Sequence, residues 1–330
     1  MIKRSRPGLV LLASLTLSTL STLANAATAA PASPAWPAGP IRLVVPYPPG
    51  GSSDIIARAI STQLGAALKQ NVIVDNRPGA SGNMGADAVA KSTDGHTLLL
   101  CDVGALAIAP SVYTKLPFDP SKDLRGVTML AYSPHLLVVH PGVPASNLGE
   151  LVSLSKTRPL NFAVTALGSA PHLAGVAVEQ ATGAKWTYIP YKGGAQSVAD
   201  TIAGQTEVTM NGMLATLPHV QSGKLKVLAV SKGTRVPLLA KVPTIAEQGL
   251  KGFESGTWQG VLAPASMPPA AIAKLNTVLT AIIRSPEVRE RLVSQGAEVH
   301  TMTTAEFTSF FDAERKRWAQ VVAKGGVKLD

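Results

Sequence analysis

Short apolar runs rich in β-branched residues alternate along this chain with stretches of helical periodicity, and Gly-rich loops join them. This alternation predicts parallel sheets whose strands are connected by crossover helices. The runs occupy residues 41–46, 71–75 and 97–101 in the first half, and residues 161–164, 186–189 and 208–210 in the second. Each half repeats strand, loop and helix three times. The sequence therefore predicts an α/β protein of two lobes, each a mostly parallel sheet flanked by helices.

Two further extended segments predict how the chain passes between these lobes. Residues 136–140 are expected to leave the first lobe, and residues 257–263 to return to it, so that two crossover segments form a hinge. The predicted first lobe comprises residues 41–137 and 259–330, and the second comprises residues 138–258.

The C-terminal helices are expected to complete the first lobe. Pro286 after Ser285 favours a helix start. Thr303 and Glu306 have the spacing of a capping box. One helical face then carries large apolar residues, which predicts packing in the core. These residues are Phe307, Phe310, Phe311, Trp318 and Val322.

The N-terminal residues have the pattern of a secretory signal peptide. Three basic residues between positions 3 and 6 precede an apolar run over residues 8–23, and small residues follow at 24–26. The run is too short for a membrane span and has no second basic flank, although a retained anchor is the alternative. We expect a signal peptide over residues 1–26, a tether over residues 27–40, and a mature chain in the periplasm.

Composition excludes several classes of function. The 330 residues are 46% hydrophobic and 15% charged, as in globular proteins, with a formal net charge of +10. Three cations and no acid precede residue 27, which leaves +7 on the mature chain. These cations are scattered rather than clustered among aromatic residues, so no nucleic-acid partner is expected. The lone Cys101 excludes an intrachain disulfide and is expected to be buried in a strand. The six His residues lack metal-ligand spacing, so no metal or cofactor is expected.

Candidate binding residues lie in the loops after the predicted strands. In open α/β sheets, ligands bind beyond the carboxyl ends of strands, where unpaired N–H groups of helix N-termini favour negative charge. We expect a small organic carboxylate to bind there without help from Lys or Arg. For residues 52–54 the alternative is simple capping of the following helix. The candidate ligand-binding residues are Tyr47, Pro49, Gly50, Gly51, Ser52, Ser53, Asp102, Thr165, Gly168, Ser169, Tyr191 and Asn211.

Six segments resemble the Bug family, the extracytoplasmic receptors of tripartite tricarboxylate transporters. They are PIRLVVPYPPGGSSDIIAR, VIVDNRPGASGNMGADAVAK, DGHTLLL, IPYKGGAQSVADTIAGQ, GKLKVLAVS and VPTIAEQG. The resemblance covers nearly all of the chain after Pro37. It implies a two-lobed periplasmic-binding-protein fold of the second type, and a ligand carboxylate held by loop backbone and ordered water. The expected partners are the ligand and the membrane components of such a transporter, and the protein is expected to be a monomer.

Two loops depart from the family pattern. Where members usually have Ser-Ser-Gly-Asn-Gly-Thr, residues 164–169 are Val-Thr-Ala-Leu-Gly-Ser, and a usual Gly-Thr-Ser-Gly-Thr-His becomes Cys-Asp-Val-Gly-Ala-Leu at residues 101–106. Both changes predict a more apolar cleft, and Asp102 adds negative charge. A mono- or dicarboxylate with an aliphatic or aromatic body is therefore expected rather than citrate. Asp102 either caps its own loop or faces the cleft and meets a donor group of the ligand.

Two other functions are compatible with parts of the sequence. An exported hydrolase is suggested by S-x-x-K at residues 153–156, but the companion motifs of that class are absent and the segment has a helical pattern. His172 follows the second-lobe loop and is expected either to contact the ligand or to pack at a helix start. A sensor that docks on a signalling receptor would use the same closure of two lobes, so the sequence does not separate it from a transport receptor.

Overall fold

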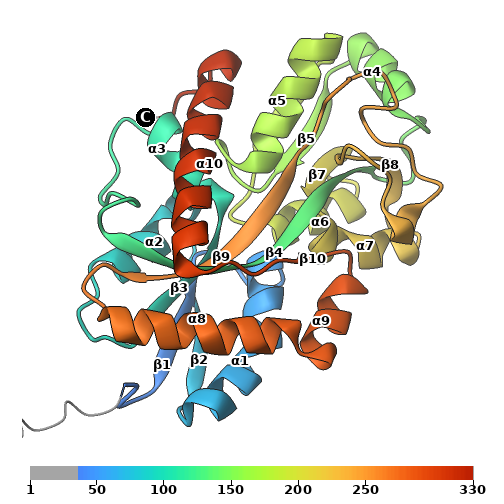
Figure 1. Ribbon diagram of the computed structural model, residues 1–330. Helices are drawn as coiled ribbons and strands as arrows, with labels where there is room; N and C mark the ends of the chain where they lie inside the picture. Colours follow the sequence, from blue (N-terminus) through green and yellow to red (C-terminus); the bar gives the residue numbers. More distant parts are fainter. Residues whose placement is uncertain (1–35, 330) are drawn as a thin grey trace, which may run out of the picture.

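The computed structural model describes residues 36–329, which form an α/β structure of two sheets flanked by helices (Figure 1). The predicted signal peptide lies outside these residues. The last five residues of the predicted tether are packed rather than free: the Trp36 indole donates a hydrogen bond to the Gly95 carbonyl at 2.7 Å. No helix within residues 36–329 is both long and apolar enough to cross a bilayer.

The first sheet has the strand order β2-β1-β3-β9-β4. β1 is parallel to β2 and β3, whereas β9 is antiparallel to β3 and β4, so the sheet is mixed. Its elements up to the crossover are β1 (Ile41–Val45), α1 (Ser52–Leu68), β2 (Val72–Asn76), η1 (Ala80–Gly82), α2 (Asn83–Ala90), β3 (Thr97–Asp102), the π-helical η2 (Gly104–Ile108), α3 (Ala109–Val112) and β4 (Leu124–Val139). The later elements are β9 (Gly256–Pro264), α8 (Pro269–Arg284), α9 (Pro286–Val293), β10 (Glu298–Val299) and α10 (Thr304–Gly325).

The second sheet repeats the parallel arrangement, because β5 is parallel to both β6 and β7. The far end of β4 joins it and is antiparallel to β7 and β8. Its elements are α4 (Leu148–Thr157), β5 (Leu160–Val164), α5 (Ala170–Thr182), β6 (Trp186–Pro190), α6 (Gly194–Ile202), β7 (Val208–Gly212), α7 (Met213–Gln221), β8 (Lys226–Val230) and η3 (Pro237–Leu239).

β4 belongs to both sheets and changes partner near its middle. Up to Pro134 it pairs with β9, and from His135 onward it pairs with β7 and β8. The partner change precedes the predicted crossover at 136–140, which is instead paired within the second sheet up to Val139. The predicted returning segment, 257–263, lies within β9 as expected. Figure 1 shows β4 and β9 running together from one half to the other.

His135 lies where β4 changes partner, and its side chain is fully buried. Its ring nitrogens lie 2.8 Å from the Thr257 hydroxyl and 2.9 Å from the Ser255 hydroxyl. The Ser231 hydroxyl accepts a bond from the His135 backbone N–H and donates to the His135 carbonyl. A buried neutral imidazole thus ties together the strands that run between the two halves.

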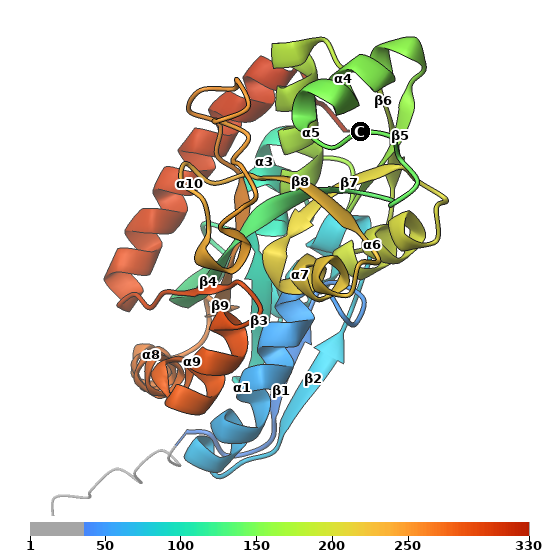
Figure 2. The same ribbon diagram turned by 90° about the vertical axis from the view of Figure 1, so that its right-hand side faces the viewer.

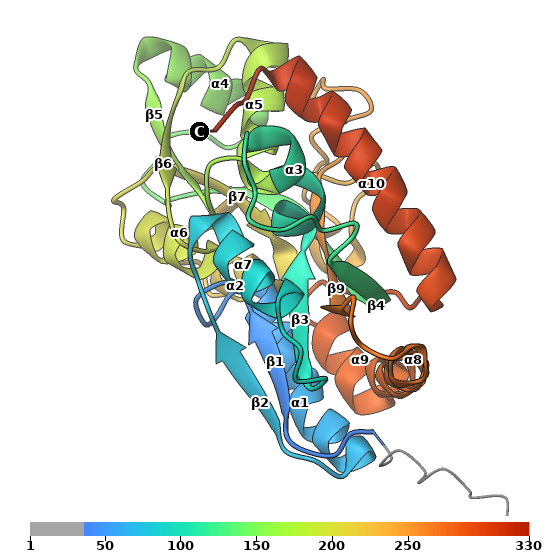
Figure 3. The same ribbon diagram turned by 90° about the vertical axis from the view of Figure 1, so that its left-hand side faces the viewer.

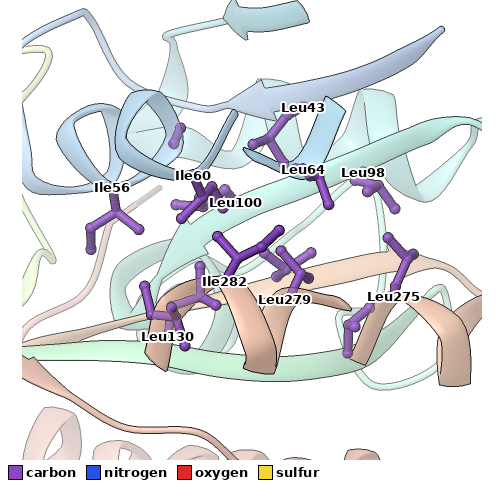
Figure 4. Packing of buried hydrophobic residues seen from close by; sticks show 14 of the residues in the cluster. Leu43, Ile56, Ile60, Leu64, Leu98, Leu100, Leu130, Leu275, Leu279 and Ile282 are labelled. Carbon is purple, nitrogen blue, oxygen red and sulfur yellow. The ribbon is translucent and has the colours of Figure 1, made fainter. Parts of the chain in front are cut away.

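Apolar residues at helical spacing fix the helices of the first sheet. Ile56, Ile60 and Leu64 repeat every four residues on α1 and pack with Leu275 and Leu279 of α8 against the sheet (Figure 4). This spacing places all five side chains on the faces that α1 and α8 turn toward each other and the strands.

The expected C-terminal core is confirmed on the other face. The capping box of Thr303 and Glu306 is present, and Phe307, Phe311, Trp318 and Val322 are buried, whereas Phe310, expected with them, is half-buried. Phe307 fits against Gly126 and Gly260, where an added Cβ would lie 2.5 Å and 2.4 Å from its ring. Figure 3 shows α10 passing beside α3 and reaching α5 of the other half.

His135 should make the free energy of unfolding depend on pH. Burial lowers its folded pKa to about 3, whereas an unfolded His takes up a proton near pH 6.5. The unfolded state therefore binds more protons below that pH, and stability falls by up to about 1.4 kcal/mol per pH unit for this residue. Urea unfolding at pH 7 and pH 5 should show a smaller pH loss for His135→Gln than for the natural chain.

The natural pH loss also includes His172, whose pKa burial lowers to about 4 and which is unchanged in the variant. His140→Gln is the control, because His140 lies outside the hydrogen-bonded network, and it should keep the natural pH loss. An equal pH loss in His135→Gln would contradict this account.

Candidate functional site

A cavity partly open to solvent lies between the two sheets at the ends of their strands. Its walls come from both halves: α1, β3 and β9 on one side, and β5, α5, α6 and β7 on the other. Figure 2 shows α6 and α7 beside the end of α1. The lining residues are Tyr47, Gly51, Ser52, Ser53, Asp102, Val103, Gly104, Thr165, Ser169, Ala170, Pro171, Gly194, Asn211 and Thr257.

The N-terminus of α1 opens into this cavity without a side-chain cap. Helix α1 begins at Ser52 and its N-cap is Gly51, so the prediction that residues 52–54 form a loop is wrong. Gly51 caps with extended backbone alone, and the Asp54 carboxylate accepts the Gly50 N–H at 3.0 Å. Of the residues 52–54 that the alternative interpretation expected to cap the helix, Ser52 and Ser53 make no capping hydrogen bond, whereas Asp54 accepts a backbone N–H just before the helix. The first N–H groups of a helix have no intrahelical partner, so this first turn presents donors to the cavity.

The hydroxyls of Ser52 and Ser53 have no hydrogen-bond partner among residues 36–329, although Ser53 is only 3% exposed. An added Cβ at Gly51 would meet nothing within 4 Å. A ligand atom can therefore approach the backbone at Gly51 closely while two hydroxyls lie beside it.

The second half contributes two further helix N-termini, which differ in the donors that they leave available. In α5, Ser169 caps the N–H of His172 and Pro171 has no N–H. In α6, Gly193 is the N-cap without a side-chain bond, and Gly194 lines the cavity. Helix α6 therefore offers more free backbone donors than α5 does.

Asn211 of β7 lies in the cavity wall with its amide already engaged. Its NH₂ group donates to the Gly194 carbonyl and the Ser197 hydroxyl, both at 3.1 Å, and its oxygen accepts the Gly212 N–H at 2.8 Å. Asn211 was expected in a loop after the strand, but β7 continues through it to Gly212. Its network holds the end of α6 against β7.

Asp102 is the last residue of β3, where it caps its own loop and also lines the cavity. Its Oδ1 accepts the Tyr47 hydroxyl at 2.7 Å and the Gly104 N–H at 2.9 Å, so it caps its own loop. It also lines the cavity, and its Oδ2 has no partner within residues 36–329. Burial raises the pKa of Asp102 to about 6 against the opposing effect of these two hydrogen bonds. Burial also raises the pKa of Tyr47 well above its ordinary value.

No Lys, Arg or His is among the residues that line the cavity. An anion held there is therefore bound by backbone and hydroxyl donors and by helix dipoles. Within the described part of the chain, no group of three or more His, Cys, Asp and Glu side chains could hold a metal ion.

Four candidate residues are not among those that line the cavity: Pro49, Gly50, Gly168 and Tyr191. Gly50 has a φ of +87°, which favours Gly at that turn. The Gly168 N–H donates to Nδ1 of His172 at 3.0 Å, so His172 packs at the helix start. Tyr191 borders a neighbouring hollow with Ala166 and Leu167, so these two apolar replacements do not line the cavity itself.

Six lining residues were not among the candidates. Val103 and Gly104 directly follow the candidate Asp102, and Gly194 belongs to the family-like segment IPYKGGAQSVADTIAGQ. The sequence could therefore have indicated these three residues. Ala170 and Pro171 follow the candidate Ser169. Thr257 lies inside β9, where the sequence pattern is that of an ordinary buried strand.

The S-x-x-K segment of the hydrolase hypothesis lies elsewhere. It is part of α4, as its helical pattern predicted, and the Ser153 hydroxyl donates to the Gly149 carbonyl within that helix at 2.9 Å. Cys101 is buried in β3, as expected.

Asp102→Asn should stabilise the folded state at neutral pH. The folded pKa of about 6 lies above the ordinary 3.8, so the folded state binds a proton between these values that the unfolded state releases. The ionised Asp102 therefore destabilises the folded state above pH 6, and this destabilisation disappears as the pH falls toward 4. We expect a gain of about 1–3 kcal/mol at pH 8 that shrinks at pH 4.5, measured by urea unfolding. A gain independent of pH would contradict the raised pKa.

Comparison with known proteins identifies the family. Residues 56–327 match the family described as the tripartite tricarboxylate transporter family receptor. Protein BugT of Bordetella pertussis (strain Tohama I) is 39% identical over 294 residues, covering 88% of this chain and 90% of BugT. The periplasmic binding protein BugD is 31% identical with a TM-score of 0.85, covering 89% of this chain and 99% of BugD.

Two further similar structures contain carboxylates. R. palustris Rpa4515 with adipate is 34% identical with a TM-score of 0.86, covering 89% of this chain and 99% of that one. MatC (Rpa3494) from Rhodopseudomonas palustris with bound malate is 30% identical with a TM-score of 0.83, covering 87% and 100%. This chain therefore belongs to the tripartite tricarboxylate transporter receptor family, as its resemblance to Bug proteins predicted, and has the two-lobed periplasmic-binding-protein fold of the second type.

Proposed function

We propose that this protein binds a small organic carboxylate between its two lobes and delivers it to the membrane components of a tripartite tricarboxylate-type transporter. The ligand is a mono- or dicarboxylate with an aliphatic or aromatic body, and the protein acts without turning it over. The observation that carries this proposal is the uncapped N-terminus of α1, which opens into a cavity whose lining has no cation. In this proposal the predicted signal peptide directs export, and the protein works in the periplasm as a monomer.

The first turn of α1 supplies the carboxylate site in this proposal. Its backbone N–H groups and dipole favour an anion, and the hydroxyls of Ser52 and Ser53 add donors at the same end. Gly51 leaves room for the ligand to reach the backbone. Thr165 and the end of α6 at Gly194 are suited to the far part of the ligand.

The ligands of similar proteins support a site of this chemistry. Adipate and malate, which occur in the two structures described above, are dicarboxylates with aliphatic bodies. Helix N-termini in both walls of the cavity suit a molecule with polar groups at two ends.

Gly51→Val tests the carboxylate site. Gly51 has a φ of −81°, which Val can adopt, and its Cβ would point into open space, so the chain should fold. We expect a stability loss of only about 1 kcal/mol, because Val is a poor N-cap. A thermal-shift screen of organic acids on the natural chain identifies the ligand, since a ligand of the folded state raises the melting temperature. Calorimetry should then show binding at least ~100-fold weaker in the variant, as expected when polar partners are displaced.

Gly39→Val is the matched control, because an added Cβ at Gly39 also meets nothing within 4 Å but lies outside the cavity. It should bind as the natural chain does. Natural affinity in Gly51→Val would contradict the assignment of this site.

Closure of the lobes is tested by small-angle scattering. The loops of the two halves touch beside the cavity: an added Cβ at Gly193 would lie 2.7 Å from Cδ of Pro48. In the proposed mechanism, residues 41–137 with 259–330 hinge against residues 138–258 about β4 and β9. The radius of gyration should fall when the ligand identified by the screen saturates the protein. An unchanged radius at saturation would count against closure.

A further inference from the structure

We infer that Asp102 selects the ligand by requiring a hydrogen-bond donor on it, so that the natural ligand is an amino or hydroxy acid rather than a bare carboxylate. This inference rests on the proposed function and names its substrate class. It is carried by the position of one carboxylate oxygen in the cavity wall.

The two oxygens of Asp102 have different surroundings. Oδ1 is committed to the Tyr47 hydroxyl and the Gly104 N–H, at 2.7 Å and 2.9 Å. Within residues 36–329 both hydrogen bonds to the carboxylate reach Oδ1 and none reaches Oδ2, and the residue lines the cavity. Asp102 is half-buried, so a ligand in the cavity can reach Oδ2 as a free acceptor.

The Asp102 side chain is held in place by its neighbours. The Tyr47 hydroxyl is wedged beside Gly82 and Gly104, where an added Cβ would lie 2.9 Å and 3.3 Å from its oxygen. An added Cβ at Gly104 would also lie 3.0 Å from Oδ1 of Asp102. The two hydrogen bonds to Oδ1 and these close neighbours restrain the carboxyl group, so a ligand meets it in a preferred orientation.

The charge of Asp102 then decides between ligands. The cavity lining contains no cation that could neutralise it, and a ligand carboxylate at the first turn of α1 adds a second negative charge to the same space. A bare acid leaves Oδ2 unsatisfied and the two charges opposed. An ammonium or hydroxyl group near Oδ2 supplies the missing donor, and an ammonium also offsets the charge.

The charge is present under ordinary assay conditions. With a pKa of about 6, Asp102 is mostly ionised at pH 7.5. The titratable groups in contact with it, Tyr47 and Cys101, have pKa values raised well above their ordinary ranges and stay neutral at that pH.

The test uses matched acids that differ in one group. The sets are propanoate, lactate and alanine; succinate, malate and aspartate; and phenylacetate, mandelate and phenylglycine. Calorimetry at pH 7.5 on the natural chain should show the tightest binding for a hydroxy or amino acid, by about 10–100-fold over the bare acid of its set. In Asp102→Asn this ratio should fall to within about threefold, with the bare acid bound as well as before or better. If Asp102→Asn does not fold, Asp102→Ser is used in its place.

Ser53→Ala is the matched control, because it removes a cavity hydroxyl at the carboxylate end and leaves Asp102 intact. It should weaken all members of a set alike and preserve their ratio. A bare acid that binds as tightly as its counterparts, or an unchanged ratio in Asp102→Asn, would overturn the inference while leaving the proposed function in place. Failure of every acid to bind the natural chain would instead contradict the proposed function and this inference with it.

Discussion

The ladder that β4 forms with both sheets determines the rest of the architecture. β4 leaves β9 at Pro134 and joins β7 and β8 from His135, so the two halves are joined through one continuous strand. Where β4 changes its pairing partner, backbone and side-chain polar groups in the protein interior need other hydrogen-bond partners. His135, Ser231 and Ser255 satisfy them with hydrogen bonds that cross between strands. The same network holds Thr257, which lines the cavity, so the crossover and the ligand site share a residue.

The sheets that β4 joins bring helix N-termini to opposite walls of one cavity. Within each sheet, the helices that follow parallel strands begin at the same edge. The two sheets turn these edges toward one cavity, so α1, α5 and α6 begin near one another. The sequence then adjusts each terminus. α1 is left open by Gly51, whereas Ser169 and Pro171 reduce the donors of α5. Gly193 leaves α6 open in the same way, so free backbone donors face the cavity from both walls.

Much of this arrangement could be predicted because it follows from local patterns. The strand periodicity, the Gly-rich loops and the capping box at Thr303 each depend on residues close in sequence. The start of α1 was missed because Gly51 caps it with backbone alone, which leaves no side-chain signal. The setting of Asp102 could not be predicted, since it depends on Tyr47, 55 residues earlier in the chain. The place of Thr257 in the cavity likewise depends on the pairing of β9 rather than on its neighbours.

A lining without cations also bears on how a receptor of this kind would release its ligand. Backbone N–H groups and hydroxyls hold a carboxylate strongly only where water is excluded, since electrostatic interactions weaken steeply as the local dielectric constant rises. An Arg or Lys partner would keep attracting the anion after the lobes had separated. In the proposed mechanism the attraction would depend on closure itself. Opening at β4 would let water compete for the donors of Ser52 and Ser53 and for the acceptor of Asp102, so separation of the lobes would weaken both ends of the site.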